Sequence, residues 1–227
     1  MKTSYYLLLA AVLITLTGMV ATDVLLKQEY DKIDWTDKYQ FFARRTLPAA
    51  RHVVIDGMLD REILIEKHAV GQALISPDDS LLYSSRMQGD TLYIQFRSPK
   101  PGQMQAGKFS GASLGLVLRF PSLATLRLTN SFVTMSKLTV SDLAVSLRNS
   151  EIRANQLGIA NRLLLAEERG SVVSLNEGQV SDLQLTVQDS SRICVNDTRI
   201  DTFTPTLSGR AEVQLSGQAN RWVTRNL

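Results

Sequence analysis

Paired carboxylates are the first residues in this sequence that could carry chemistry, because two acids at a suitable separation act as general acid and base in glycoside hydrolysis. The candidates are Asp78-Asp79 and Glu167-Glu168. Neighbours in a strand point to opposite faces, so neither pair is expected to converge on one substrate. We predict that Asp78-Asp79, which follows a proline, forms a turn, and that Glu167-Glu168 is a solvated charge run at a corner.

The two histidines and the single cysteine form no recognisable catalytic set. His52 begins a strand and His68 lies in an alternating strand; neither has a sequence partner that suggests a triad, so both are predicted to be surface or edge residues. Cys194 lies between two apolar residues, should face outward and has no adjacent base. Asn196-Asp197-Thr198 satisfies the glycosylation sequon, although Asn196 is better explained as a corner residue. We predict no catalytic residue, no cofactor and no metal site.

The composition predicts a folded protein. The 227 residues include 25 Lys and Arg against 22 Asp and Glu, and 44% are hydrophobic. Disordered chains have lower hydrophobicity, and nucleic-acid-binding proteins concentrate basic residues, so both classes are excluded. A single cysteine forbids an internal disulfide framework.

An uncharged run from Thr3 to Thr22 predicts that the N-terminus inserts into a membrane. Twenty helical residues reach across ~30 Å of hydrocarbon. A retained anchor over residues 1–27 is favoured. The alternative is a cleaved signal peptide ending at Ala21, although Met19 would then occupy the −3 position, where small residues are usual. Lysines follow the span, yet export signals lie this close to the start of a chain, so we expect a single pass with the body in the periplasm or at the cell surface.

Residues 28–49 are predicted to be a juxtamembrane linker, and Pro48 marks a plausible boundary. Two interpretations of its aromatic residues stay open: they lie at the level of the lipid headgroups, or Phe41 and Phe42 pack on the folded domain. The aromatic residues are Tyr30, Trp35, Tyr39, Phe41 and Phe42.

From residue 50 onward the hydrophobic period is two, which predicts strands. Apolar runs at 52–55, 63–65, 92–96 and 114–118 are bounded by turn residues such as Asp56-Gly57, Gly89-Asp90 and Pro99-Gly102. There is no amphipathic stretch long enough for a crossover helix. We expect a head domain over 50–222, with a less regular part (50–122), regular coils (123–222) and a tail (223–227).

An internal repeat in the C-terminal half decides the predicted fold. Five units, at 130–136, 149–155, 170–176, 190–196 and 210–216, are offset by 19, 21, 20 and 20 residues. Each contains an apolar pair spaced by two: Val133/Met135, Ile152/Ala154, Val173/Leu175, Ile193/Val195 and Val213/Leu215. A second strand keeps the same period, and a third apolar position recurs at Val140, Ile159, Val180 and Ile200. Three inward runs per coil of about 20 residues predict an all-β, three-sided parallel β-helix.

Small polar residues recur at two corners of each predicted coil. One set follows the apolar pairs: Ser136, Asn155, Asn176, Asn196 and Ser216. A second set consists of small pairs at 130–131, 149–150, 170–171 and 190–191. Short amides and hydroxyls tolerate a bent backbone and can hydrogen-bond from one coil to the next. We therefore predict a ladder of amides along the stack.

The strands at 90–94 and 117–126, leading into Asn130-Ser131 and the coils, resemble the auto-transporter adhesin head domain, or GIN domain, of bacterial envelope proteins. The resemblance covers residues 50–222. This sequence departs from the usual Ser-Gly-Ser corners, since only Gly170-Ser171 and Ser208-Gly209 supply glycine. The resemblance implies a right-handed β-helix and a surface or periplasmic setting, and it implies no activity.

Two functions follow as hypotheses. The first is a membrane-tethered structural or adhesion module that presents a flat face to a carbohydrate, a lipid or an envelope protein. The second is a carbohydrate-active enzyme on the same scaffold. Such enzymes use aromatic platforms and charged clusters, whereas Trp35 lies in the linker and Trp222 is the last residue of the predicted head domain. We favour the first hypothesis.

Overall fold

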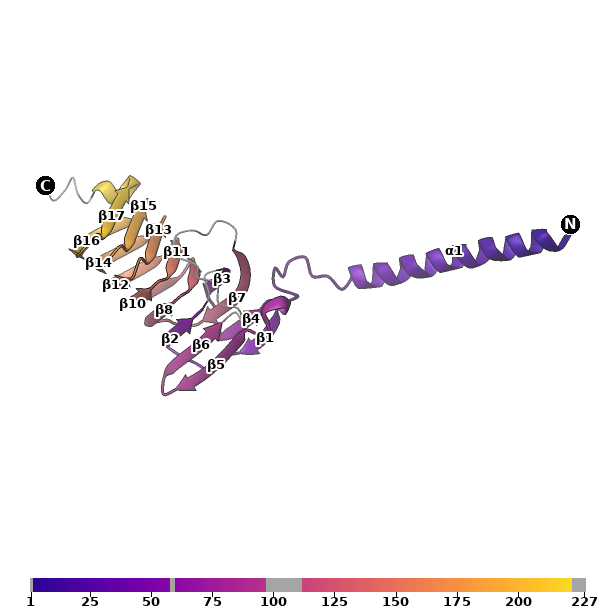
Figure 1. Ribbon diagram of the computed structural model, residues 1–227, viewed down its shortest axis with the longest axis horizontal. Helices are drawn as coiled ribbons and strands as arrows, with labels where there is room; N and C mark the ends of the chain where they lie inside the picture. Colours follow the sequence, from indigo (N-terminus) through magenta and orange to yellow (C-terminus); the bar gives the residue numbers. More distant parts are fainter. Residues whose placement is uncertain (1, 58–59, 97–111, 222–227) are drawn as a thin grey trace. The chain divides into compact units, whose positions relative to one another are not determined.

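A computed structural model describes residues 2–57, 60–96 and 112–221, and the chain divides into two compact units between Phe41 and Phe42 (Figure 1). Trp222 and the tail at 223–227 lie outside the described residues, as does the turn predicted at Pro99-Gly102.

The first unit contains α1 (Lys2–Tyr30), the one α-helix among the described residues. Its segment Tyr5–Tyr30 reaches a mean hydropathy of 2.1 and is not buried within the structure. This helix is long and apolar enough to cross a membrane, and a signal sequence has the same properties. Beyond the helix, the Trp35 ring lies 5.5 Å from the ring of Tyr30. The side chain of Phe41 is 71% exposed.

The second unit is mostly β-structure and forms two sheets of mixed strand direction. The nine-stranded sheet contains, in spatial order, β1 (Ala43–Thr46), β4 (Gln72–Ile75), β7 (Ser113–Phe120), β3 (Arg61–Lys67), β9 (Phe132–Ser136), β11 (Glu151–Asn155), β13 (Val172–Asn176), β15 (Arg192–Asn196) and β17 (Glu212–Ser216). The eight-stranded sheet contains β16 (Arg199–Leu207), β14 (Gln179–Val187), β12 (Gly158–Glu168), β10 (Thr139–Arg148), β8 (Thr125–Thr129), β2 (His52–Asp56), β6 (Thr91–Phe96) and β5 (Tyr83–Gln88). Two 3-10 helices, η1 (Pro77–Asp79) and η2 (Gly217–Ala219), complete the described elements.

Strands β8–β17 alternate between the two sheets, and every pairing among them is parallel (Figure 1). Ile152 pairs with Val133 on one side and with Val173 on the other. The registers therefore follow the repeat in the sequence. Equivalent apolar residues stack from one coil to the next and form a continuous core between the sheets.

The third predicted run does not form a separate sheet. Val140 and Ile159 belong to the first parts of β10 and β12, where the two strands pair with each other. A register shift after Val140 then bends the ladder before it continues from Asp142. A bulge changes the direction of a strand without ending it, so the described strands form two sheets.

The N-terminal half of the second unit is connected differently. Strands β2 and β3 lie inside the stack, with β8 and β9 on one side and β6 and β7 on the other. The β1–β4, β4–β7 and β5–β6 pairs are antiparallel. Strand β1 lies within the segment predicted as a linker. Spatial order and chain order therefore differ in this half.

Both rows of corner residues are hydrogen-bonded along the stack. Asn176 Nδ2 donates to Asn155 Oδ1 at 3.1 Å, and Asn196 Nδ2 donates to Asn176 Oδ1 at 3.0 Å. This confirms the predicted amide ladder. At the other corner, buried serines accept a hydrogen bond from the backbone N–H of the preceding coil's serine, as from Ser131 N to Ser150 Oγ at 3.1 Å.

The bend itself lies one residue after the amide ladder. The ladder residues stay in their strands, and the residues that follow them adopt a positive φ: Lys137, Gln156, Glu177, Asp197 and Gly217. Four of these five positions hold a side chain, although this conformation favours glycine. We expected the small polar residues themselves to form this bend, but the bend lies at the next residue along the chain.

Candidate ligand-binding trough

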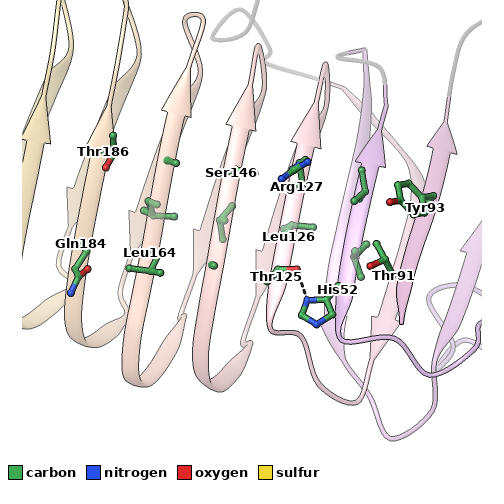
Figure 2. A pocket seen from close by; sticks show the side chains of 16 residues that line it. His52, Thr91, Tyr93, Thr125, Leu126, Arg127, Ser146, Leu164, Gln184 and Thr186 are labelled. Atoms are coloured by element: carbon green, nitrogen blue, oxygen red, sulfur yellow. Dashed lines mark hydrogen bonds between the residues drawn. The ribbon is translucent and has the colours of Figure 1, made fainter. Parts of the chain in front are cut away.

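A shallow trough of about 610 Å³ crosses the outer face of the eight-stranded sheet. It runs across six neighbouring strands, β6, β2, β8, β10, β12 and β14, and its outward side chains form two rows (Figure 2). One row contains Thr91, His52, Thr125, Ala144, Leu164 and Gln184. The other contains Tyr93, Val54, Arg127, Ser146, Ala166 and Thr186. The size is that of an ordinary ligand site.

The trough is hollow because its middle strands carry short outward side chains. Ala144 and Ser146 of β10 and Ala166 of β12 form this part of the floor. Longer side chains stand at both ends, with Tyr93 on β6 and Gln184 on β14. The alternation of each strand buries the residues between them, so the floor rests directly on the core.

At one end of the trough, a carboxylate, an imidazole and a hydroxyl form a chain of contacts. His52 Nδ1 lies 2.8 Å from Thr125 Oγ1 (Figure 2), and His52 Nε2 lies 3.3 Å from Asp90 Oδ2. Three strands bring these groups together: β2 pairs with β8 at Thr125 and with β6 at Thr91, directly after Asp90. These two contacts hold the imidazole of His52 in one orientation at the surface.

Tyr93 supplies the aromatic surface of the trough. The guanidinium of Arg86 lies 5.1 Å from the centre of its ring. Arg86 comes from β5, on the opposite side of β6 from β2, so the stacked cation leaves the β2 side of the ring facing Val54 and the trough. A cation stacked on one ring face stabilises the ring position.

Arg127 is the cation within the trough. Its side chain is exposed on β8, and it forms no ion pair with the residues that the structure describes. Charges at the far end are paired instead: Arg162 Nε lies 3.0 Å from Asp182 Oδ2, which also accepts a hydrogen bond from Gln184 Nε2 at 2.9 Å. The guanidinium of Arg127 is thus available to an anionic group of a ligand.

The structure separates the first pair of candidate carboxylates from the trough. Asp78 and Asp79 lie in η1, which confirms the predicted turn. Asp79 is nevertheless buried, with its Oδ1 3.3 Å from Arg61 Nε. Burial raises the pKa of the Asp79 carboxyl, and the charge of Arg61 opposes this effect. The ion pair between Asp79 and Arg61 therefore stabilises the fold, away from the trough.

The prediction that Glu167 is solvated is wrong. Its side chain is fully buried, and neither carboxylate oxygen has a hydrogen-bond partner in the described part of the chain. Glu167 belongs to the inward row of the sheet, where it pairs with Leu147 and Val187, while Glu168 is exposed. Burial raises the pKa of Glu167 to about 8. The strand continues further than the sequence indicates, so one member of the acidic run enters the core.

The prediction for His52 is also incomplete, because this histidine is part of the trough. His68 is half-buried, and its Nδ1 accepts a hydrogen bond from the backbone N–H of Val70 at 3.2 Å. Cys194 is half-buried between Ile193 and Val195, and burial raises the pKa of its thiol, which opposes formation of a nucleophilic thiolate.

The side chains of the glycosylation sequon make hydrogen bonds within the protein. Asn196 belongs to the amide ladder, as expected, and Thr198 is 1% exposed. Thr198 Oγ1 donates to the carbonyl oxygen of Asn196 at 3.1 Å and accepts from the backbone N–H of Gly178 at 3.3 Å. These contacts connect neighbouring coils.

Sequence reasoning missed Thr91, Tyr93, Thr125 and Arg127 as a group. His52 and Thr125 are 73 residues apart, and they belong to strands that share no repeat. One signal was present: within the predicted strands, an outward Tyr and Arg stand among short side chains. That signal becomes informative only once the order of the strands is known.

Comparison with known proteins gives distant structural similarities. No family model and no curated protein matches the chain. A "putative adhesin" from Bacteroides fragilis covers 79% of this chain and 98% of its own length at 11% identity and a TM-score of 0.42. A "putative lipid binding protein" from Parabacteroides distasonis covers 77% and 94% at 12% identity and a TM-score of 0.35. A "putative cell adhesion protein" from Clostridium sporogenes covers 77% and 97% at 7% identity and a TM-score of 0.36. Function is therefore argued from the trough alone.

Proposed function

We propose that this chain is a membrane-tethered, non-enzymatic binding module of the cell envelope, with a structural or adhesive role, whose ligand lies in the trough. The trough carries this proposal. It combines a floor of short side chains with a tyrosine, an exposed arginine, hydroxyls and an amide. A few polar groups placed over a partly apolar surface are typical of binding sites.

The proposed scaffold is a right-handed, three-sided parallel β-helix of the GIN type over residues 50–222. The parallel registers of β8–β17 support it, and the short segments before the register shifts would form the third side. Such a scaffold holds outward side chains at fixed intervals and presents a rigid platform.

Residues 1–27 would anchor this head domain through a span over residues 3–22, with residues 28–49 as the connection and the body outside the cytoplasm. The length and hydropathy of α1 support the anchor. In membranes prepared from cells that make the full chain, we expect the protein to resist carbonate extraction and to keep its N-terminus. Recovery of a mature N-terminus near Thr22 would show a cleaved signal instead.

Binding is tested with a variant that fills the trough. Ser146→Trp places a large side chain on the floor, whereas Thr134→Trp places the same side chain on the outer face of the nine-stranded sheet. With the full chain in lipid nanodiscs, binding to purified envelope polymers is measured for both variants. We expect Ser146→Trp to abolish binding and Thr134→Trp to preserve it. Equal binding by both variants would refute the proposal.

A second candidate function is hydrolysis of carbohydrate esters, which the Asp90–His52–Thr125 chain favours. Thr125 Oγ would attack the ester carbonyl, with His52 accepting the hydroxyl proton and Asp90 orienting the ring. Acyl transfer also needs donors for the oxyanion. The backbone N–H groups of Ala124 and Thr125 both donate to the carbonyl oxygen of Arg51, at 2.8 and 3.1 Å, and are not available.

We therefore favour the binding role. The enzyme is tested by measuring hydrolysis of an activated acetyl ester by the full chain, Thr125→Val and His52→Ala. Turnover that both substitutions abolish would replace the binding role with catalysis. Equal, slow hydrolysis by all three proteins is expected.

A further inference from the structure

The shape of the trough restricts its ligand to an extended chain. Six strands with ~4.8 Å between neighbours give a length of about 24 Å, and two outward positions on one strand are about 6.6 Å apart. The hollow is therefore several times longer than it is wide, and it is continuous from Tyr93 to Gln184 (Figure 2). A compact metabolite would occupy a small part of it.

The backbone beneath the trough excludes recognition of a peptide by strand addition. Strands β2, β8, β10, β12 and β14 each have a hydrogen-bonded neighbour on both sides. Strand addition needs an unpaired sheet edge, and the trough lies on a face. Recognition must therefore come from side chains.

The side chains of the trough do not form an apolar stripe. Leu164, at 40% exposure, is the large apolar side chain of the floor, and its neighbours in the same row are the short Ala144 and the polar Gln184. An amphipathic helix or an acyl chain needs continuous apolar contact. Hydroxyl and amide groups from β6, β8, β10 and β14 instead match a ligand that carries hydroxyls at every repeat.

Two side chains make this match specific. The β2 side of the Tyr93 ring gives a flat apolar surface for the C–H face of a sugar ring. On β8, Arg127 presents a planar fork of donors that suits a carboxylate. Asp90 does not compete for this guanidinium, because its Oδ2 lies 3.3 Å from His52 Nε2.

We infer that the ligand is a linear glycan whose sugars carry carboxylates, with a uronate on Arg127 and a neighbouring ring against Tyr93. This inference rests on the proposed function of the trough and names the class of its ligand. The glycan runs across the strands, along the axis of the stack, and the hydroxyls of Thr125, Ser146 and Thr186 bind its hydroxyl groups.

The test uses the full chain in nanodiscs and three probes: an oligogalacturonate, a neutral glucose oligosaccharide of equal length, and inorganic polyphosphate. We expect the oligogalacturonate to bind, and Arg127→Gln to weaken this binding about tenfold or more, since charged hydrogen bonds are strong. Arg148→Gln is the matched control, because Arg148 is exposed on β10 but outside the trough. It should change affinity less than twofold. Thermal unfolding shows whether each variant is folded.

Each of the other outcomes would refute either the inferred ligand or the proposed binding function. Equal binding of the neutral oligosaccharide with no effect of Arg127→Gln would refute the uronate while leaving the binding role intact. Binding of polyphosphate with the same dependence on Arg127 would show a simple anion site and refute the glycan. If none of the three probes binds while an envelope protein or lipid binds in a manner that Ser146→Trp abolishes, the glycan inference fails and the proposed function stands. Failure of every ligand to respond to Ser146→Trp overturns both.

Discussion

The two halves of the second unit, β1–β7 and β8–β17, pair their strands differently. In β8–β17 each strand pairs with the equivalent strand of the next coil, and spatial order follows chain order. In β1–β7 three pairings are antiparallel, and β2 and β3 lie between elements distant in sequence. A repeat makes every strand register the same. It therefore stabilises the fold but brings few different combinations of side chains together. The half without a repeat can place different side chains beside one another.

The trough lies where these two halves meet. The repeating half supplies its smooth floor, with Ala144, Ser146 and Ala166. The other half supplies His52 and Tyr93, and the first repeat strand adds Arg127. The difference shows how a regular platform acquires chemical specificity at its irregular end.

The largest expected effect tests whether the two halves fold as one unit. Leu183 in β14 and Ile55 in β2 are both completely buried in one core cluster. An unpaired charge there costs several kcal/mol of a stability that is usually ~5–15 kcal/mol, so Leu183→Asp and Ile55→Asp should each unfold the whole domain. Far-UV circular dichroism of both variants measures this. If Ile55→Asp leaves the repeating half folded, the halves are independent.

Thr186→Asp is the control, because this side chain is exposed. It should change stability by less than ~0.5 kcal/mol. Gln184, the adjacent outward choice, is unsuitable since it is half-buried and bonded to Asp182.

The next effect concerns Glu167, whose buried carboxyl lies among apolar side chains of the repeat. Its pKa is about 8 in the folded protein, against an ordinary value of 4.5, so the folded chain retains a proton that the unfolded chain loses. Its contribution to stability is complete below about pH 4.5 and is lost as the pH rises to about 8. Within this window the free energy of unfolding should fall by about 1.4 kcal/mol per pH unit.

Glu167→Leu should remove this dependence, because leucine matches the neighbours Leu147 and Val187 and leaves no unpartnered oxygen. Urea unfolding between pH 5 and pH 8 measures the slope. Glu168→Gln, at the exposed neighbour, should leave the slope unchanged. A flat profile in the unsubstituted chain would mean that Glu167 has a partner in solution.

A smaller effect is expected from the amide ladder, which belongs to the repeating half. Asn176 is bonded to an amide on both sides, so Asn176→Ala should cost roughly 1–3 kcal/mol. Asn155→Ala should cost less, because Asn155 is bonded to a ladder amide on one side, that of Asn176. Asn196 is a poor control, since its Oδ1 also accepts from Ser216 Oγ at 2.6 Å. Urea midpoints that are indistinguishable at 155 and 176 would show that the ladder is not cooperative.

The smallest effect acts in the opposite direction. Lys137 has a φ of 52°, in a region where side chains are strained. Lys137→Gly should raise the stability by up to about 1 kcal/mol, after the entropy that glycine costs. The matched control is Lys67→Gly in β3, which should destabilise the protein. A loss of stability at 137 would show that its side chain contributes more than the strain.

The sequence by itself determined the strands, the inward and outward alternation and the registers of the repeating half. The apolar pairs of the repeat required no knowledge of distant residues, because each coil stacks on the next and the same residue types meet. The amide ladder followed from the same argument, and Asn155, Asn176 and Asn196 are bonded as expected.

Only the tertiary structure decided the pairings of the other half and hence the trough. No local pattern connects His52 with Thr125 or with Thr91, because long-range strand pairing depends on how the whole domain buries its apolar faces. The same competition placed Glu167 inside the core, where the alternation of its strand prevailed over its charge. Periodic packing is encoded locally, whereas the meeting of non-repeated strands is a property of the complete fold.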